Sequence, residues 1–254
     1  MNLDTAAVMI DSPLSQSGYM PRWHSCAASN VGHLRKANED SFLDAREQCL
    51  WVVADGMGGH SRGDLASQII IEKLLDFSPG TDAASAVDAM RERLYAANTR
   101  CRSLAHGQVM GSTVAAMFSL QNQAFLLWAG DSRIYRLRDG EMQQLTEDHS
   151  LVQELCRLGE LTEEEAENHP SSNVITRAVG VHEELEIDVV ETEVRPGDRF
   201  LLCSDGLFKD VRREEIRKCL SSPSPEEALA DLVKQALDRG GTDNVTAIVV
   251  QASY

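Results

Sequence analysis

Closely spaced cysteines and long apolar runs are both missing from this 254-residue sequence. The nearest two cysteines, Cys203 and Cys219, lie 16 residues apart, which excludes the C-x-x-C pairs of zinc sites and thioredoxin-like redox sites. No stretch approaches the roughly 18 apolar residues of a membrane-spanning helix, and the N-terminus lacks the basic and apolar regions of a signal peptide. We therefore predict a cytoplasmic protein with no membrane contact, whose cysteines are mostly buried, reduced thiols.

Basic residues are also scarce. The chain has 24 Lys and Arg against 40 Asp and Glu, a formal net charge of −16, so its long-range field repels phosphate backbones and anionic lipids, and we expect no nucleic-acid partner. With 43% hydrophobic residues and only 7 Pro, the composition excludes disordered, collagen-like and coiled-coil classes. We predict a flexible N-terminal segment, residues 1–21, followed by a single globular, monomeric domain over residues 22–254.

Hydrophobic periodicity predicts strands and helices in a definite order. Apolar runs of strand length stand at 49–56, 111–120, 123–131, 199–206 and 244–252, and a hairpin is expected over 133–145 around Asp139-Gly140. Helical spacing marks 63–77, 83–104 and a helix that Ser224 caps and Gly240-Gly241 ends. This order lacks the strict strand–helix alternation of a parallel sheet, so we expect mainly antiparallel sheets covered outside by helices.

The stretch from Glu147 to Glu193 is unusually acidic and contains short helical segments, one of which begins with a capping box at Thr162–Glu165. Such a stretch is either a solvated insertion or a flap beside a functional site. We mark residues 146–171 as a flap candidate.

Three aspartates share one setting in the sequence. Asp55, Asp131 and Asp205 each follow an apolar run and stand beside a glycine, and Asp243 precedes the last predicted strand. The runs before Asp55 and Asp205 are almost entirely apolar, as in strands buried on both faces. If the strand ends meet at one edge, their charges need compensation, because two bare carboxylates about 4 Å apart repel by about 4 kcal/mol at an effective dielectric near 20.

Protein cations are scarce in these segments, so a divalent metal is the expected compensation. All of the candidate ligands are oxygens, which favours Mg²⁺ or Mn²⁺ over zinc or copper. For Asp139-Gly140 a plain hairpin turn is the better interpretation.

Seven short motifs, taken in chain order, resemble the metal-dependent protein phosphatases of the PPM or PP2C type, in their bacterial branch. The resemblance extends over residues 24–252 and rests on Arg35-x-x-Asn38-Glu39-Asp40, Asp55-Gly56-Met57-Gly58-Gly59-His60, Gly111-Ser112-Thr113, Ala129-Gly130-Asp131-Ser132-Arg133, Thr176-Arg177-Ala178-Val179-Gly180, Cys203-Ser204-Asp205-Gly206-Leu207 and Gly241-Thr242-Asp243-Asn244. It implies an α+β fold, a four-layer αββα sandwich of two mainly antiparallel sheets flanked by helix pairs.

The resemblance also implies a dinuclear centre and a role for each matching residue. Asp55 would bridge two metal ions, with Glu39 and the Gly56 carbonyl completing the second site and Asp205 and Asp243 holding the first. Mn²⁺ or Mg²⁺ would fill both positions. A third, weaker ion is left open, with Asp131 among its ligands.

Two further residues would act on the substrate and on water. By the same resemblance, Arg35 would bind the substrate phosphate with its planar fork, and Asp40 would orient metal-bound water. The implied reaction is hydrolysis of phosphoserine and phosphothreonine by direct attack of a metal-bridging hydroxide, without a phosphoenzyme. A bacterial Ser/Thr protein kinase and its phosphorylated targets would be the partners.

The general acid stays unassigned. Many eukaryotic members carry a His after the Asp-Gly, where this chain has Met57, and Met cannot donate a proton. His60 or metal-bound water are the alternatives. We assign Arg133 and Arg177 structural roles.

Rival functions are weaker. The glycines after Asp55 lack the Lys-Ser/Thr of a P-loop, which argues against nucleotide binding. A thiol phosphatase is excluded because no cysteine is followed by an Arg six residues later. The remaining alternative is a catalytically silent phosphatase-like module that binds a phosphoprotein or a kinase.

Overall fold

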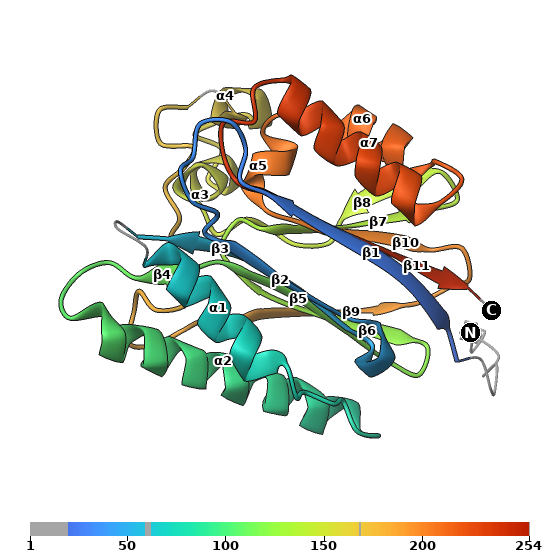
Figure 1. Ribbon diagram of the computed structural model, residues 1–254, viewed down its shortest axis with the longest axis horizontal. Helices are drawn as coiled ribbons and strands as arrows, with labels where there is room; N and C mark the ends of the chain where they lie inside the picture. The colour runs from blue at the N-terminus through green and yellow to red at the C-terminus, as the bar shows by residue number, and fades with distance from the viewer. Residues whose placement is uncertain (1–19, 59–61, 168, 254) are drawn as a thin grey trace, which may run out of the picture.

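Two β-sheets lie face to face, with helices on the outer face of each. The structure, a computed structural model, describes residues 20–58, 62–167 and 169–253. Figure 1 shows the four layers: helices α6 and α7, the first sheet, the second sheet, and helices α1 and α2. This is the αββα sandwich that the motifs implied. Of the predicted N-terminal segment, only Met20 and Pro21 lie within the described residues, so the division of the chain at residue 22 stays a prediction.

The first sheet has five strands in the order β1-β11-β10-β7-β8, all antiparallel. The strands are β1 (Arg22–Asn30), β7 (Arg133–Arg138), β8 (Glu141–Gln144), β10 (Arg199–Cys203) and β11 (Val245–Ser253).

The second sheet has the order β2-β3-β5-β6-β9, again antiparallel, with the short strand β4 paired to β3. Its strands are β2 (Asp40–Ala45), β3 (Leu50–Met57), β4 (Gly111–Ser112), β5 (Val114–Leu120), β6 (Gln123–Ala129) and β9 (Asp188–Glu193). A 3-10 turn over Arg46–Gln48 joins β2 to β3.

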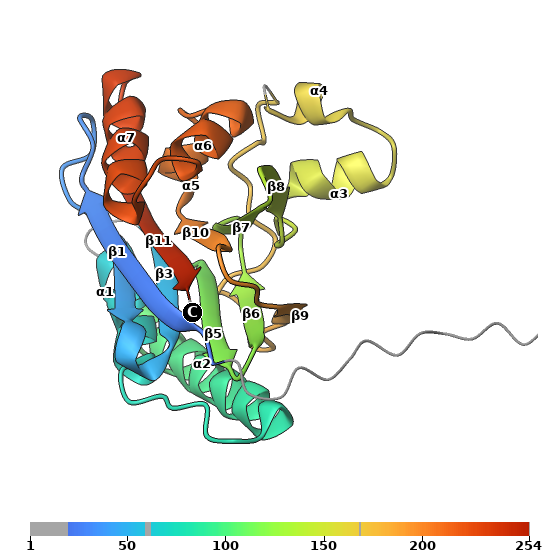
Figure 2. The same ribbon diagram turned by 90° about the vertical axis from the view of Figure 1, so that its right-hand side faces the viewer.

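Helices cover the outside of both sheets. The outer layers consist of α1 (Gly63–Leu74), α2 (Ala83–Ala105), α6 (Arg213–Leu220) and α7 (Pro225–Asp238). The shorter helices are α3 (Leu151–Arg157), α4 (Glu163–Glu167) and α5 (Asp205–Phe208). The Ser224 side chain accepts a hydrogen bond from the Glu227 amide and Pro225 opens α7, as the sequence predicted. Helices α3 and α4 project from the sandwich on the side of β8 (Figure 2), and both lie within the flap candidate.

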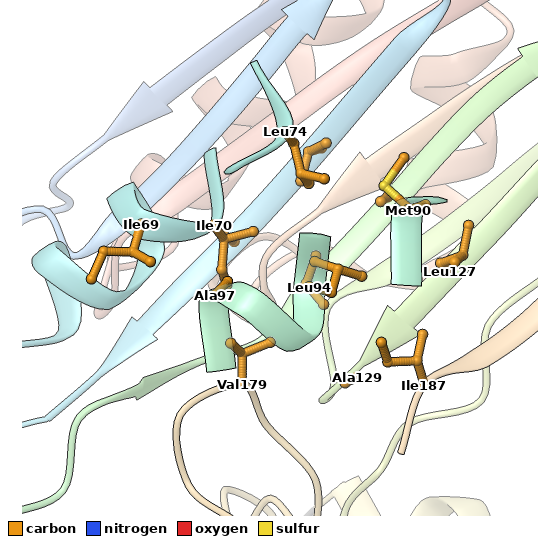
Figure 3. Packing of buried hydrophobic residues seen from close by; sticks show 14 of the residues in the cluster. Ile69, Ile70, Leu74, Met90, Leu94, Ala97, Leu127, Ala129, Val179 and Ile187 are labelled. Carbon is orange, nitrogen blue, oxygen red and sulfur yellow. The ribbon is translucent and has the colours of Figure 1, made fainter. Parts of the chain in front are cut away.

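Three apolar clusters hold the layers together. Between the sheets, Trp51, Met117, Phe200 and Ile248 are among the fully buried residues. Beneath the second sheet, side chains of α1 and α2 pack on β6 and neighbouring segments (Figure 3). Strand β3 is buried on both faces, because Leu50, Val52 and Ala54 pack on the helices while Trp51 and Val53 face the other sheet. The rigid strand therefore presents Asp55 at a fixed position.

Several predicted boundaries need correction. The predicted strand 111–120 is broken at Thr113, and the predicted strand 199–206 ends at Cys203, since Asp205 begins the short helix α5. Strands β1, β2 and β9 and helix α6 were not predicted. Edge strands β1, β2 and β9 are only partly buried and carry polar residues, so their apolar period is weak. The Asp139-Gly140 hairpin is confirmed, with both residues at positive φ, 51° and 82°.

All six cysteines are free thiols, three of them buried and three half-buried, which is fewer buried than predicted. Among the described residues, no helix is both long enough and apolar enough to cross a membrane.

Candidate active site

Two carboxylates come together first, on neighbouring strands. Asp40 opens β2 and is the direct antiparallel partner of Asp55 near the end of β3, so both side chains lie on the same face of the sheet. The Ser204 hydroxyl donates to Asp40 Oδ2 at 2.8 Å, and the Thr246 amide donates to Ser204 Oγ at 3.0 Å. Ser204 and Thr246 belong to the other sheet's strand ends, so this chain of hydrogen bonds joins the two sheets beneath the site.

Asp205 and Asp243 reach the same edge from the first sheet. Gly206 packs so closely on the loop before β11 that a Cβ there would lie 2.1 Å from the Asn244 carbonyl oxygen, which explains the glycine. Asn244 ties this loop to the strand of Glu39: it accepts from the Glu39 amide at 2.8 Å and donates to the Val31 and Ala37 carbonyls at 2.9 and 3.0 Å.

Glu39 and Gly56 are held by close backbone contact. The Gly56 amide donates to the Glu39 carbonyl at 3.1 Å, and the Gly63 amide at the start of α1 donates to the Glu39 carboxylate. A Cβ at Gly56 would lie 2.2 Å from the Gly63 carbonyl oxygen, so only glycine fits. The glycine motif after Asp55 is therefore a site of tight packing between β3, β2 and α1.

Asp131 lies in the turn after β6 and is 4% exposed. The turn is fixed by Thr113, whose hydroxyl pairs with that of Ser132 at 2.7 Å and accepts from the Asp55 amide at 3.0 Å. Thr113, where the predicted strand 111–120 is broken, thus joins the Asp55 segment of β3 to the Asp131 turn.

The pKa values show that these carboxyl groups share one poorly hydrated space. Burial, followed by the charge of Asp40 and then of Asp205 and Asp131, raises the pKa of Asp55 well above its ordinary value. Burial raises the pKa of Asp40 to about 6 and that of Asp131 to about 7, with Asp205 adding to both. Burial and Asp64 raise the pKa of Glu39. The predicted gathering of carboxylates at one edge is present.

Two protein cations also stand beside these carboxylates: Arg35, which the resemblance implied, and Lys209, which the sequence analysis did not mark. The Lys209 ammonium contacts Asp205 Oδ2, and the Arg35 guanidinium donates to Asp243 Oδ2 at 2.7 Å. Arg35 also feels the charges of Asp205 and Asp55. Lys209 was missed because the strand was expected to run through Asp205; once Asp205 begins a helix, the spacing of four residues brings Lys209 over it.

The residues present fit divalent cations. Three buried oxygens, Asp40 Oδ1, Asp131 Oδ1 and Asp205 Oδ1, accept no hydrogen bond from any described residue, and buried carboxylate oxygens without partners are costly. The donor set consists of oxygens, which suits Mn²⁺ or Mg²⁺. As they stand, however, no three His, Cys, Asp or Glu side chains of the described ranges are close enough together to hold a metal ion. Lys209 and Arg35 instead engage the outer oxygens of two of the expected ligands.

The candidates for the general acid remain without assignment. Met57 is half-buried at the end of β3, and His60 lies outside the described residues. Arg133 and Arg177 have the structural roles that we predicted. Arg133 binds Asp148 with bonds of 2.7 to 3.0 Å and stacks 3.7 Å from the centre of the Phe208 ring, while Arg177 pairs with Asp188 at 3.0 Å.

Comparison with known proteins decides the family. A family model described as Protein phosphatase 2C matches residues 33–248, a range that contains all eight predicted site residues. The chain belongs to the protein phosphatase 2C family. The resemblance drawn from the seven sequence motifs is confirmed.

Curated members of the protein phosphatase 2C family from bacteria are clearly similar to this chain. Serine/threonine protein phosphatase PstP of Mycobacterium tuberculosis is 42% identical over 228 residues, which are 88% of this chain and 44% of PstP. Serine/threonine phosphatase stp of Listeria innocua is 36% identical over 240 residues, 90% of this chain and 95% of that protein. The chain thus spans less than half the length of PstP.

Solved structures agree with the fold. PppA, described as a key regulatory component of T6SS in Pseudomonas aeruginosa, matches with a TM-score of 0.84 and 46% identity, covering 91% of this chain and 97% of PppA. The catalytic domain of PstP in complex with two manganese ions matches with a TM-score of 0.82 and 38% identity, and the match covers 91% of this chain and 99% of that domain. The predicted fold class is confirmed.

Proposed function

We propose that this chain is a metal-dependent protein phosphatase that hydrolyses phosphoserine and phosphothreonine in proteins, with Mn²⁺ or Mg²⁺ as its cofactor. The observation that carries the proposal is the convergence of Asp40, Asp55, Asp131 and Asp205, with unsatisfied buried oxygens on three of them. Family membership and the manganese-containing PstP domain support it.

Five groups would hold two cations. Asp55 would serve both cations, Asp205 and Asp243 would serve one, and Glu39 with the Gly56 carbonyl would serve the other. When bound, such a pair of cations makes a shared water acidic and neutralises charge on the phosphoryl oxygens. The backbone contacts between Gly56 and Glu39 keep the second group rigid, so little reorganisation is needed on loading.

Arg35 is proposed to bind the substrate phosphate. Its side chain is 53% exposed, and its guanidinium lies within the field of Asp243, Asp205 and Asp55, so it can reach both solvent and the site. A guanidinium offers two parallel donors to two phosphoryl oxygens, which a lysine cannot do. The hydrogen bond that Arg35 donates to Asp243 holds the guanidinium at the edge of the site before substrate binds.

Asp40 is proposed to orient water rather than to bind a cation directly. Ser204 fixes one of its oxygens and leaves the other, Oδ1, without a partner beside Asp55. A carboxylate held in one orientation can accept a hydrogen bond from a water molecule. That hydrogen bond would turn the lone pair of the water toward the phosphorus atom of the substrate.

The alternative of a catalytically silent binding module is weaker. A module that only binds phosphoproteins needs no set of cation ligands, whereas Glu39, Asp55, Asp205 and Asp243 are all present here at the site edge. No observation in the described residues favours a module that binds phosphoproteins without hydrolysing them.

The proposal extends to the cellular setting. A Ser/Thr protein kinase would supply the phosphorylated substrates, and the chain would act as a monomer in the cytoplasm, where its six free thiols stay reduced. The acidity of the flap candidate, residues 146–171, is proposed to disfavour phosphosites that have acidic neighbours. Equal turnover of acidic and basic phosphopeptides would refute that preference.

The test uses p-nitrophenyl phosphate and a phosphothreonine peptide with EDTA, Mn²⁺, Mg²⁺ or Ca²⁺. Activity should require Mn²⁺ or Mg²⁺ and disappear in Asp205→Asn. The matched control is Asp238→Asn, since Asp238 forms the same kind of lysine pair on the surface of α7. Activity that survives EDTA, or an Asp205→Asn enzyme as active as the control, would overturn the proposal.

A further inference from the structure

Lys209 connects the site to the segment that follows the flap candidate. It lies directly after α5, four residues beyond Asp205, and its ammonium contacts both Asp205 Oδ2 and Asn173 Oδ1. Asp205 and Asn173 are 32 residues apart in the sequence, and no described backbone hydrogen bond joins them. One ammonium therefore forms a bridge between a proposed metal ligand and the chain beyond α4.

The charge of Lys209 acts on the inner carboxylates as well. Burial alone would lower its pKa, but Asp205, and then Asp131 and Asp55, outweigh burial and the pKa is raised. Lys209 in turn acts to lower the pKa of Asp131. Its side chain is 34% exposed while that of Asp205 is 13% exposed, so the cation approaches the carboxylates from the solvent side.

Asn173 is well placed to pass this contact on to the flap candidate. The Leu151 amide at the start of α3 donates to the Val174 carbonyl at 2.9 Å, and the Thr176 amide donates to the His149 carbonyl at 2.8 Å. Ser150 and Ile175 form an isolated bridge between the same two stretches. The start of the flap candidate is thus joined to the residues that directly follow Asn173. A contact that holds Asn173 therefore also positions the base of the flap.

We propose that Lys209 is a built-in cation that takes the place of a third metal ion beside Asp205 and Asp131, and that it fastens the base of the flap candidate to the site through Asn173. This inference rests on the proposed function. The sequence left a third ion open, with Asp131 as a ligand. The Lys209 ammonium contacts Asp205 Oδ2 and leaves Asp205 Oδ1 for one of the two core cations. Its charge also acts on Asp131, so a further divalent cation on the Oδ2 side would be repelled.

The first test counts bound Mn²⁺ by equilibrium dialysis and by isothermal titration calorimetry up to millimolar Mn²⁺. Wild type should bind two ions, Lys209→Met should bind a third, and Lys209→Arg, which keeps the charge, should return to two. Lys234→Met is the matched control, because Lys234 pairs with Asp238 at the same spacing on an exposed face and should leave the count at two.

The outcomes separate the two proposals. Wild type that binds three ions, or Lys209→Met that still binds two, overturns the role of Lys209 and leaves the proposed function standing. Wild type that binds no Mn²⁺ overturns both. If Lys209→Met does not fold, as judged by circular dichroism, Lys209→Gln is counted in its place.

The second test concerns the flap and leaves Lys209 intact. Asn173→Ala should leave the ion count at two but speed amide hydrogen exchange over residues 146–175 about tenfold, as expected when one hydrogen bond to a charged group is lost. Lys209→Met should produce the same acceleration, and Lys234→Met should not. Unchanged exchange in both Asn173→Ala and Lys209→Met would refute the fastening role.

Discussion

Asp40 and Asp55 are direct partners across the antiparallel pair of β2 and β3, which puts two carboxylates on one face of the sheet at its edge. Like charges at directly opposite positions are destabilising. Burial is the first cause of the raised pKa of both groups, and the charge of Asp40 adds to the rise at Asp55. A protein keeps such a pair only where something else compensates it. The compensation in the described residues is incomplete, since Asp40 Oδ1 has no partner, and this is why the arrangement indicates a site for cations.

Ser204→Ala should weaken the site without removing any proposed ligand. The Ser204 hydroxyl holds Asp40 through Oδ2, and loss of such a supporting hydrogen bond costs about 10–100-fold in metal affinity or activity. Mn²⁺ titrations and phosphopeptide kinetics measure the effect, with Ser222→Ala, at a half-buried position outside the site, as the control. Equal kinetics in the two variants would contradict the supporting role of Ser204.

Arg35→Ala should raise KM more than it lowers kcat. If Arg35 binds the ground-state phosphate with two charge-assisted hydrogen bonds, the loss corresponds to about 10–100-fold in KM. Arg35→Lys should recover only part of this, because a point charge cannot contact two oxygens in the same geometry. A collapse of kcat at constant KM would show instead that Arg35 acts in the transition state.

The metal-free protein should become less stable as the pH rises from 5 to 7.5. The folded-state pKa values of Asp40, about 6, and Asp131, about 7, lie above the ordinary 3.8, so between about pH 4 and 7 the native state binds more protons than the unfolded chain. Their stabilising contribution is complete below about pH 4 and is lost as the pH rises through the folded-state values.

Thermal melting in EDTA measures this dependence. Asp131→Asn should melt at a higher temperature than wild type at pH 7.5 and at a similar temperature at pH 5, and each kcal/mol corresponds to about 2–4 °C in a chain of this size. Added Mn²⁺ should remove most of the difference in wild type, since bound cations favour the ionised form. Asp238→Asn is the control. The prediction would be contradicted if the Tm of wild type rose relative to the Tm of Asp131→Asn as the pH increased from 5 to 7.5.

Asn244→Ala should lower stability and displace Glu39. Asn244 makes three side-chain hydrogen bonds, to the Glu39 amide and to the Val31 and Ala37 carbonyls, and each is worth about 1 kcal/mol. We expect a loss of about 2–4 kcal/mol in urea unfolding together with weaker Mn²⁺ binding. Normal stability with normal metal binding would show that the loop is held by other contacts.

Several turns, caps and strands of this protein could be predicted from the sequence because they depend on local chemistry. The Asp139-Gly140 turn, the Ser224 cap and the apolar run before Asp55 depend on a few neighbouring residues, and each was correctly predicted. The motif order also identified the family and, with it, the sandwich. The edge strands β1, β2 and β9 escaped prediction because half-exposed strands carry no strong apolar period.

The sequence by itself determined which carboxylates this protein has and that each follows a buried or turn-forming segment. Only the tertiary structure decided which of their oxygens are satisfied and by what. Arg35 meets Asp243 across 208 positions, Ser204 meets Asp40 across 164, and Lys209 meets Asn173 across 36. Such contacts depend on how two sheets and a flap pack together, and no local periodicity encodes the register between segments so far apart.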